Sequence, residues 1–207
     1  MNDKTMFNLT YGLFVLTASL DGKDNGCIIN TAGQVTAVPN RISIAVNKSN
    51  FTHDMILASG KFNVSILSEE ADFSIFKRFG FQSGRDVNKF DGYEHAVRGE
   101  NGIYYVTEGT NGFISAQVET TLDLGTHTLF IAGGTDMDVL SDIPSTTYTY
   151  YQNHIKPKPL PKTESEKGVT IWRCRICGYE YKGDVLPDDF ICPICKHPAS
   201  DFEKITG

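Results

Sequence analysis

The chain has 207 residues, a formal net charge of −6, and ordinary proportions of hydrophobic (40%) and charged (21%) residues. These values are typical of a globular protein, and no stretch approaches the roughly 20 apolar residues of a membrane-spanning helix. The acidic balance, without runs of Lys or Arg, argues against nucleic-acid binding.

Strand patterns dominate residues 1–154. The first apolar run ends at Leu20 and is followed by DGKDNG rather than by the cleavage site of a secretory signal, so we expect a first strand and a cytoplasmic location. Apolar alternation and β-rich runs predict further strands at 27–38, 41–47, 61–67, 102–107, 112–124 and 127–140. Six or more strands predict a closed or nearly closed barrel.

Two segments depart from the strand pattern. In SNFTHDMILASG, Ser49 or Asn50 is a candidate N-cap and Gly60 a stop signal, while Phe73, Phe76 and Phe79 have helical spacing. We expect two short helices outside the barrel. The polar, Gly-rich stretch 80–92 predicts a loop, which either borders a functional face or is simply a solvated connection.

Residues 155–168, IKPKPLPKTESEKG, mark the clearest domain boundary. Three prolines alternate with lysines and give way to a polar, charged run that cannot build a core. Proline-rich composition favours an extended spacer. We therefore predict a first domain at 1–154, a linker at 155–168 and a small second domain at 169–207.

Four of the five cysteines form two CxxC pairs, Cys174 with Cys177 and Cys192 with Cys195, separated by 14 residues. Two residues between thiolates let each pair present both sulfurs to one ion, and four thiolates favour zinc or iron in a tetrahedral site. Two disulfides and a thioredoxin-like redox pair are weaker alternatives, because the chain shows neither a secretory signal nor the strand–helix context.

The residues around these cysteines resemble rubredoxin. The matching features are Trp172 before the first pair, Cys-Gly-Tyr at 177–179, LPDDF at 186–190, Cys-Pro at 192–193 and DFE at 201–203. The resemblance implies a rubredoxin-like domain that holds one iron on four cysteines and carries single electrons. The segment between the pairs is shorter than in common rubredoxins, and Lys196 replaces a usual glycine. We expect the aromatic residues to pack as a miniature core.

Two polar segments of the first domain, 25–31 and 47–53, combine strand ends with groups that suit an anion. Lys48, Ser49, Asn50, Thr52 and the backbone N–H groups of the following helix could together hold a phosphate. Helix capping explains the same residues equally well. The residues alone leave both interpretations open.

The runs TYGLFVLTAS, NGCIINTAGQVTAVP, ISIAVNKSNFTHDMI and KFNVSIL resemble flavin-reductase-like proteins, including flavoredoxins, which are FMN-binding split barrels. The resemblance spans about residues 1–155 and implies FMN as cofactor. It assigns to the ring and ribityl chain Asn25, Gly26, Cys27, Ile28, Ile29, Asn30 and Thr31. It assigns to the ribityl and phosphate region Asn47, Lys48, Ser49, Asn50, Thr52 and His53.

Three further residues are candidates with simpler alternatives. His127 lies in GTHTLF, where the family commonly has Gly-Asp-His, and it is either a flavin or nicotinamide contact or a buried, satisfied histidine. Lys89 resembles the lysine of a family Lys-Phe pair, or is a solvated lysine beside Phe90. Cys27 invites a redox role, but a small buried hydrophobe is the simpler interpretation.

The fusion of the two modules resembles the high-molecular-weight rubredoxins. That resemblance implies a homodimeric NAD(P)H-dependent oxidoreductase, NADH favoured, in which FMN passes electrons singly to the iron and the iron reduces a flavodiiron protein active on nitric oxide or dioxygen. Without a GxGxxG fingerprint, nicotinamide would bind transiently over the flavin, and no side chain is expected to be catalytic. A free-flavin or ferric reductase, and a non-catalytic sensor with a C-terminal zinc ribbon, remain alternatives.

Overall fold

The computed structural model describes residues 2–157, 170–175, 179–193 and 198–205. It divides the chain into two compact units, Met1–Lys156 and Pro157–Gly207. Most of the predicted linker, from residue 158 on, lies outside the described residues.

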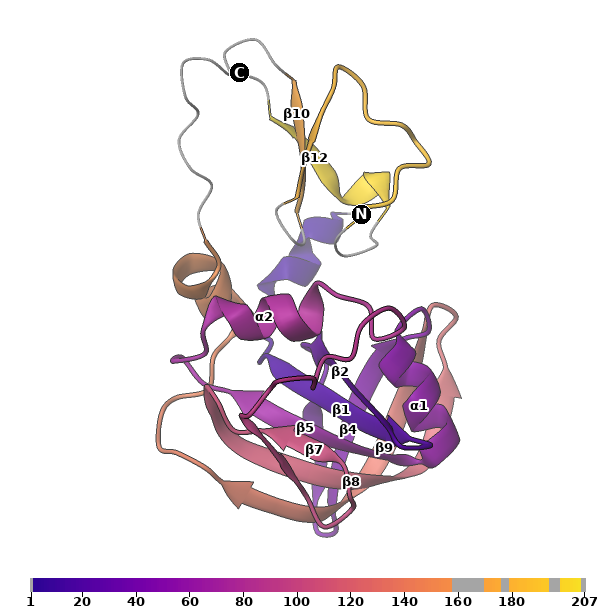
Figure 1. Ribbon diagram of the computed structural model, residues 1–207, viewed down its shortest axis with the longest axis vertical. Helices are drawn as coiled ribbons and strands as arrows, with labels where there is room; N and C mark the ends of the chain where they lie inside the picture. The colour runs from indigo at the N-terminus through magenta and orange to yellow at the C-terminus, as the bar shows by residue number, and fades with distance from the viewer. Residues whose placement is uncertain (1, 158–169, 176–178, 194–197, 206–207) are drawn as a thin grey trace. The chain divides into compact units, whose positions relative to one another are not determined.

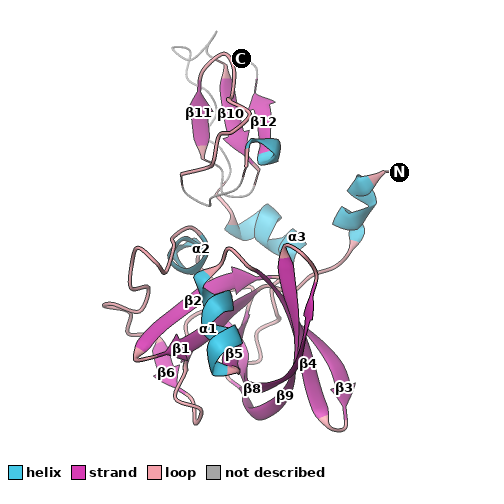
Figure 2. Ribbon diagram, turned by 90° about the vertical axis from the view of Figure 1, so that its right-hand side faces the viewer, coloured by secondary structure: helices cyan, strands magenta, loops and turns pink. Residues whose placement is uncertain are grey.

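The first unit is mainly β, as the strand patterns predict (Figures 1 and 2). Its elements in chain order are η1 Asp3–Asn8, β1 Phe14–Leu20, β2 Lys23–Ile29, β3 Gly33–Ala37, β4 Asn40–Asn47, α1 Phe51–Ser59, β5 Lys61–Leu67, α2 Phe73–Gly80, β6 Ala96–Arg98, β7 Tyr104–Val106, β8 Thr110–Asp123, β9 His127–Val139, α3 Tyr148–Tyr150 and η2 Tyr151–Ile155. No helix in the described part of the chain is long and apolar enough to cross a membrane.

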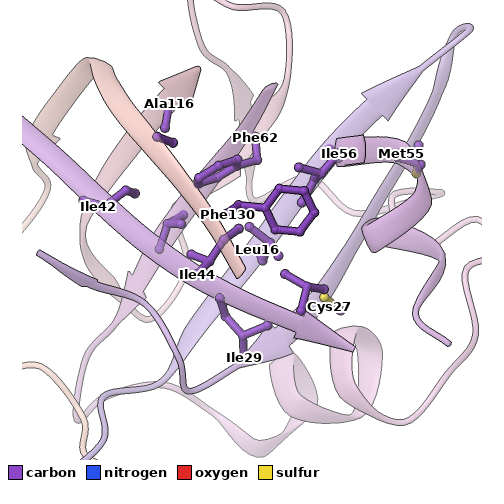
Figure 3. Packing of buried hydrophobic residues seen from close by; sticks show 14 residues of the cluster. Leu16, Cys27, Ile29, Ile42, Ile44, Met55, Ile56, Phe62, Ala116 and Phe130 are labelled. Atoms are coloured by element: carbon purple, nitrogen blue, oxygen red, sulfur yellow. The ribbon is translucent and has the colours of Figure 1, made fainter. Parts of the chain in front are cut away.

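Seven strands form one antiparallel sheet in the order β2-β1-β5-β8-β9-β4-β3. The sheet curls around a single core, because Leu16 of β1, Ile44 of β4, Phe62 of β5 and Phe130 of β9 belong to one buried cluster (Figure 3). Met55 and Ile56 belong to the same cluster, so α1 closes one side of this core (Figure 3). The predicted split β-barrel with short helices is confirmed.

The predicted strand at 27–38 is two strands in the structure. β2 begins at Lys23, because Asp21 and Gly22 both adopt positive φ (50° and 76°) and form a two-residue turn from β1. DGKDNG is therefore a turn followed by a strand. β3 then starts at Gly33, separated from β2 by residues 30–32.

Strand β5 is buried on both faces, which apolar alternation does not predict. Phe62 and Val64 face the core, and Asn63 and Ser65 on the other face are also fully buried. The segment that contains β7 covers this outer face, and the two β5 side chains form hydrogen bonds to the backbone of that segment. Asn63 Nδ2 donates to the Ile103 carbonyl at 2.9 Å, and Ser65 Oγ accepts from the Val106 N–H at 2.9 Å.

The second unit has a three-stranded sheet in the order β11-β10-β12, formed by β10 Ile171–Cys174, β11 Glu180–Lys182 and β12 Phe202–Ile205. A 3-10 turn, η4 Ala199–Asp201, precedes β12. Its small core consists of Cys174, Leu186, Cys192 and Phe202, with Trp172, Tyr179, Tyr181, Phe190 and Ala199 packed against them. The expected packing role of the aromatic residues is confirmed.

Replacing Asn63 by Ala should destabilise the first unit. The change removes the bond to the Ile103 carbonyl, which keeps only its bond from the Gly99 N–H, and it removes the buried acceptor for the Asn101 side chain. We expect a loss of about 1–3 kcal/mol in the free energy of unfolding, measured by urea titration. The exposed amide variant Gln82→Ala should change it by less than about 0.5 kcal/mol, and equal effects of the two variants would contradict this account.

Candidate functional site

The first predicted segment meets the second where β2 passes the start of α1. Asn25 Nδ2 donates to Thr52 Oγ1 at 2.9 Å, and both side chains are buried. The side chain of Asn50 accepts from the Thr52 N–H at 3.2 Å, so Asn50, not Ser49, caps α1. Gly60 ends the helix in the left-handed conformation, as predicted. Capping is therefore present, and it orients the helix N-terminus beside β2.

Asn47, Lys48 and Ser49 lie at the end of β4 and remain partly accessible. Asn47 Oδ1 accepts from the backbone N–H and the hydroxyl of Ser49, both at 2.9 Å, and Lys48 forms an exposed ion pair with Asp123 at 2.6 Å. His127 lies opposite Asn47 in the β4–β9 register. It is half-buried, and its Nδ1 lies 2.9 Å from Thr126 Oγ1. These groups could meet a phosphate near the start of α1.

His53 points into the protein. Its Nε2 lies 2.9 Å from Thr128 Oγ1 and its Nδ1 lies 3.0 Å from Asp54 Oδ1, with the side chain almost fully buried. The hydrogen bond from His53 has the largest effect on the Asp54 carboxyl and lowers its pKa against the opposing effect of desolvation, and Arg85, at 2.6 Å, lowers it further. Both ring nitrogens are thus engaged, and a ligand at His53 would have to replace one of these bonds.

The loop after α2 lies against Asn25. A Cβ atom added at Gly84 would lie 2.0 Å from Asn25 Oδ1, so only glycine fits there without a shift. Arg85 fixes the loop to α1, through Asp54 and through its guanidinium group 5.0 Å from the centre of the Phe51 ring. Residue spacing alone does not identify Gly84, Arg85 or Asp54 as site residues. For Gly84 and Arg85 the one signal was the polar, Gly-rich stretch 80–92, and Asp54 carried none.

Lys89 is buried, only 3% exposed, so it is not a solvated lysine. Its Nζ donates to the Gly26 carbonyl at 2.7 Å and to the Phe79 carbonyl at 3.0 Å. Desolvation lowers its pKa to about 8, with a smaller opposing effect from Cys27. The bond to the Gly26 carbonyl joins the loop to the middle of β2.

Cys27 is a buried member of the barrel core (Figure 3). Burial raises the pKa of its thiol, against smaller lowering effects from Thr52, Lys89 and Asn50. The thiol is therefore neutral near pH 7, which agrees with the interpretation of Cys27 as a small buried hydrophobe.

The other residues of the first segment are mostly occupied within the fold. Ile29 packs in the barrel core and Ile28 packs against the cluster around α2. Thr31 Oγ1 donates to the Ala45 carbonyl at 2.7 Å and accepts from the Ala45 N–H at 3.2 Å. Asn30 is half-buried.

The part of the site at β2 fits a bound flavin. Asn25 Oδ1 is buried and has no hydrogen-bond partner among the residues that the structure describes. A buried acceptor of this kind requires a donor from a ligand or from water. The capped N-terminus of α1, which favours an anion, lies beside it. The Asn25 acceptor suits an N–H group of the flavin ring, and the N-terminus of α1 suits the flavin phosphate.

The described part of the predicted metal centre consists of Cys174 and Cys192. Both are fully buried in the same small cluster, Cys174 at the end of β10 and Cys192 in the segment after Phe190. Cys177, Cys195 and Lys196 lie outside the described residues. Two buried sulfurs from separate segments in one core fit a thiolate-ligated ion.

The chain matches the family described as "Flavin reductase like domain" over residues 6–158 and "Rubrerythrin, rubredoxin-like domain" over residues 172–203. It is 36% identical to "High molecular weight rubredoxin" of Moorella thermoacetica, over 99% of this chain and 100% of that protein. It is 37% identical to "Ferric-chelate reductase (NAD(P)H)" of Archaeoglobus fulgidus, over 79% of this chain and 95% of that protein.

Solved structures show the same fold in the first unit. The NADH:FAD oxidoreductase of Streptomyces globisporus C-1027 superposes with a TM-score of 0.62 at 20% identity, covering 70% of this chain and 84% of that chain. Flavoredoxin of Methanosarcina acetivorans superposes with a TM-score of 0.56 at 23% identity, covering 67% and 73%. The chain belongs to the flavin reductase-like family and, through its C-terminal rubredoxin-like domain, to the high-molecular-weight rubredoxins.

Proposed function

We propose that this chain is a cytoplasmic NAD(P)H-dependent oxidoreductase, with NADH as the favoured donor, that carries electrons through FMN to one iron on Cys174, Cys177, Cys192 and Cys195. The observation that carries the proposal is the presence of both domains in one chain that matches high-molecular-weight rubredoxin over 99% of its length. A flavin reductase-like domain fused to a rubredoxin-like domain makes the chain an electron-transfer oxidoreductase.

The side chains of the first unit bind and orient the cofactor in this proposal. FMN, when bound, takes up two electrons as a hydride and releases them one at a time. Asn25 Oδ1 would accept a hydrogen bond from the ring, beneath the loop that Arg85 and Lys89 fix over β2. The N-terminus of α1, with Ser49 and Asn50, would hold the phosphate.

We propose a flavodiiron protein that reduces nitric oxide or dioxygen as the external acceptor. A rubredoxin centre carries one electron at a time, which suits transfer to another protein. We also propose a homodimer. Its support is the exposed edge strand β3 and a neighbouring cavity of about 390 Å³, lined by apolar side chains that include Phe14, Ile42 and Met137.

A ferric-chelate or free-flavin reductase is the second candidate. The support is the 37% identity to a ferric-chelate reductase over nearly all of that protein's length. In this alternative the first unit acts alone and the rubredoxin-like unit is an accessory.

The visible spectrum of anaerobically purified protein during NADH addition tests the relay. We expect flavin bands and ferric-thiolate absorption in one sample, both bleached by NADH, with iron found by metal analysis. Bound zinc, or iron that stays oxidised while the flavin is reduced, would contradict an internal relay.

Cys192→Ser separates the two candidates because it removes one buried thiolate. If the relay is correct, NADH oxidation coupled to a flavodiiron acceptor falls at least tenfold, while NADH still bleaches the flavin. The exposed variant Ser200→Ala is the control and should leave both rates unchanged. Unchanged coupling in Cys192→Ser, with ferric-chelate reduction also intact, would favour the second candidate.

Gly84→Ala tests the position of the flavin. The added methyl group would lie 2.0 Å from Asn25 Oδ1, so the loop or the Asn25 side chain must move. Loss of one hydrogen bond to the ring predicts FMN binding weaker by about threefold to tenfold, measured by fluorescence titration. Gly33→Ala, whose Cβ meets nothing within 4 Å, should bind FMN normally, and normal binding by Gly84→Ala would place the ring elsewhere.

A further inference from the structure

The loop after α2 covers the unfilled acceptor on β2. Asn25 Oδ1 is buried without a donor among the described residues. A Cβ atom added at Gly84 would lie 2.0 Å from this oxygen, so not even a methyl group fits between the loop and the acceptor. A flavin ring is much larger than a methyl group. An N–H group of the ring can therefore reach Asn25 only after the loop has moved aside.

Both ends of this loop are fixed to the body of the first unit. At the first end, the Phe81 N–H donates to the Lys77 carbonyl at 3.3 Å, where α2 ends. At the second end, the buried Lys89 is held by β2 and α2 through its Nζ, and its carbonyl accepts from Arg78 Nη1 at 3.0 Å. None of these bonds involves residues 82–87, which form the tip of the loop. The tip can move while both ends stay in place.

The tip has internal hydrogen bonds of its own. Ser83 Oγ accepts from the Arg85 N–H at 3.2 Å, and the Ser83 carbonyl accepts from the N–H groups of Asp86 and Val87, both at 3.1 Å. These bonds close a compact turn, and the residues from Arg85 to Val87 are exposed. The tip therefore moves as one piece, and its position depends on what ties that piece to its neighbours.

Arg85 ties the tip to α1. Its Nη2 donates to Asp54 Oδ2 at 2.6 Å, and its guanidinium group lies 5.0 Å from the centre of the Phe51 ring. No other hydrogen bond joins residues 82–87 to another element in the described part of the chain. On the helix side, Asp54 is held by the buried His53, whose Nδ1 lies 3.0 Å from Asp54 Oδ1. One side chain of the tip thus meets an acceptor that is fixed in place.

The contact between Arg85 and Asp54 is of a kind that opens readily. About half of each side chain is exposed, 49% for Arg85 and 47% for Asp54. An exposed ion pair contributes little to stability, because water solvates both charges when they separate. Dissolved salt weakens the pair further by screening the two charges. The contact is strong enough to favour the closed tip and weak enough to let it open.

We propose that the Arg85–Asp54 pair is the latch of a lid, residues 82–87, which opens to admit or release the flavin and closes again over the bound ring. The inference rests on the proposed function, in which residues 25–31 hold the ring and the start of α1 holds the phosphate. Because both ends of the loop stay fixed, the tip returns to α1 once the ring has passed it. Asp54 lies in the first turn of α1, so the latch re-forms beside the bound phosphate.

Stopped-flow fluorescence of FMN mixed with the full, flavin-free chain tests the latch. The pair is intact in the empty and bound states and broken between them, so its loss should speed entry and release equally. For Arg85→Met we expect association and dissociation rate constants that both rise about threefold, with the dissociation constant changed by less than about 1.5-fold. Asp54→Asn should have the same effect, and combining the two substitutions should add nothing. Arg41→Met breaks another exposed ion pair, with Glu119 at 2.6 Å, and should leave both rate constants unchanged.

Ionic strength gives a second measurement. Between about 20 mM and about 500 mM salt, the ratio of variant to wild-type rate constants should fall towards one, because salt already weakens the wild-type latch. Unchanged rate constants in both single variants would overturn the proposal. So would a rise in dissociation alone, which would make Arg85 a flavin contact, or a rise in association alone, which would mean that the loop only blocks an empty site. Failure of the wild-type chain to bind FMN would instead overturn the proposed function, and the inference with it.

Discussion

Every buried polar group in a curled sheet must find a partner, and this constraint organises the first unit. Wrapping seven strands around Leu16, Phe62 and Phe130 buries polar side chains on the outer face as well. Asn63 and Ser65 satisfy this constraint through hydrogen bonds to the backbone of the segment around β7. At β2 the constraint is not met internally, because the buried Asn25 acceptor stays without a donor in the described structure. The buried hydroxyl of Ser115 on β8 also lacks a partner there, so what distinguishes the Asn25 acceptor is its place in the segment that resembles a cofactor-binding one.

Local patterns predicted the elements that depend on local chemistry. The alternation in 41–47 predicted β4, and the caps at Asn50 and Gly60 predicted α1. The burial of Asn63 and Lys89 could not be predicted from spacing, because it comes from segments 40 and 63 residues distant. The turn at Asp21 was missed although Asp-Gly is a common two-residue hairpin turn, because the second strand was expected to start only at residue 27.

The candidate site shows the same division. Composition and resemblance selected segments 25–31 and 47–53, which the Asn25–Thr52 hydrogen bond does bring together. They did not distinguish side chains that face a ligand from those that face the core. That distinction depends on how α1 is rotated about its axis. The rotation turns Thr52 and His53 inward, whereas Ser49, which precedes the helix, stays accessible. In the second unit, the spacing of the cysteines was informative because two residues between thiolates constrain geometry within a few bonds.

The strand order has a consequence for how the first unit folds. The hairpin β8–β9 lies between β5 on one side and β4 on the other, so the earlier strands meet in the sheet only through it. Strands β1, β2 and β5 can pair while the chain is being synthesised, and so can β3 with β4. Their apolar faces cannot join in one core until residue 139 has left the ribosome. Folding of this unit is therefore governed by long-range closure late in synthesis, and the half-built sheets are the species most exposed to aggregation.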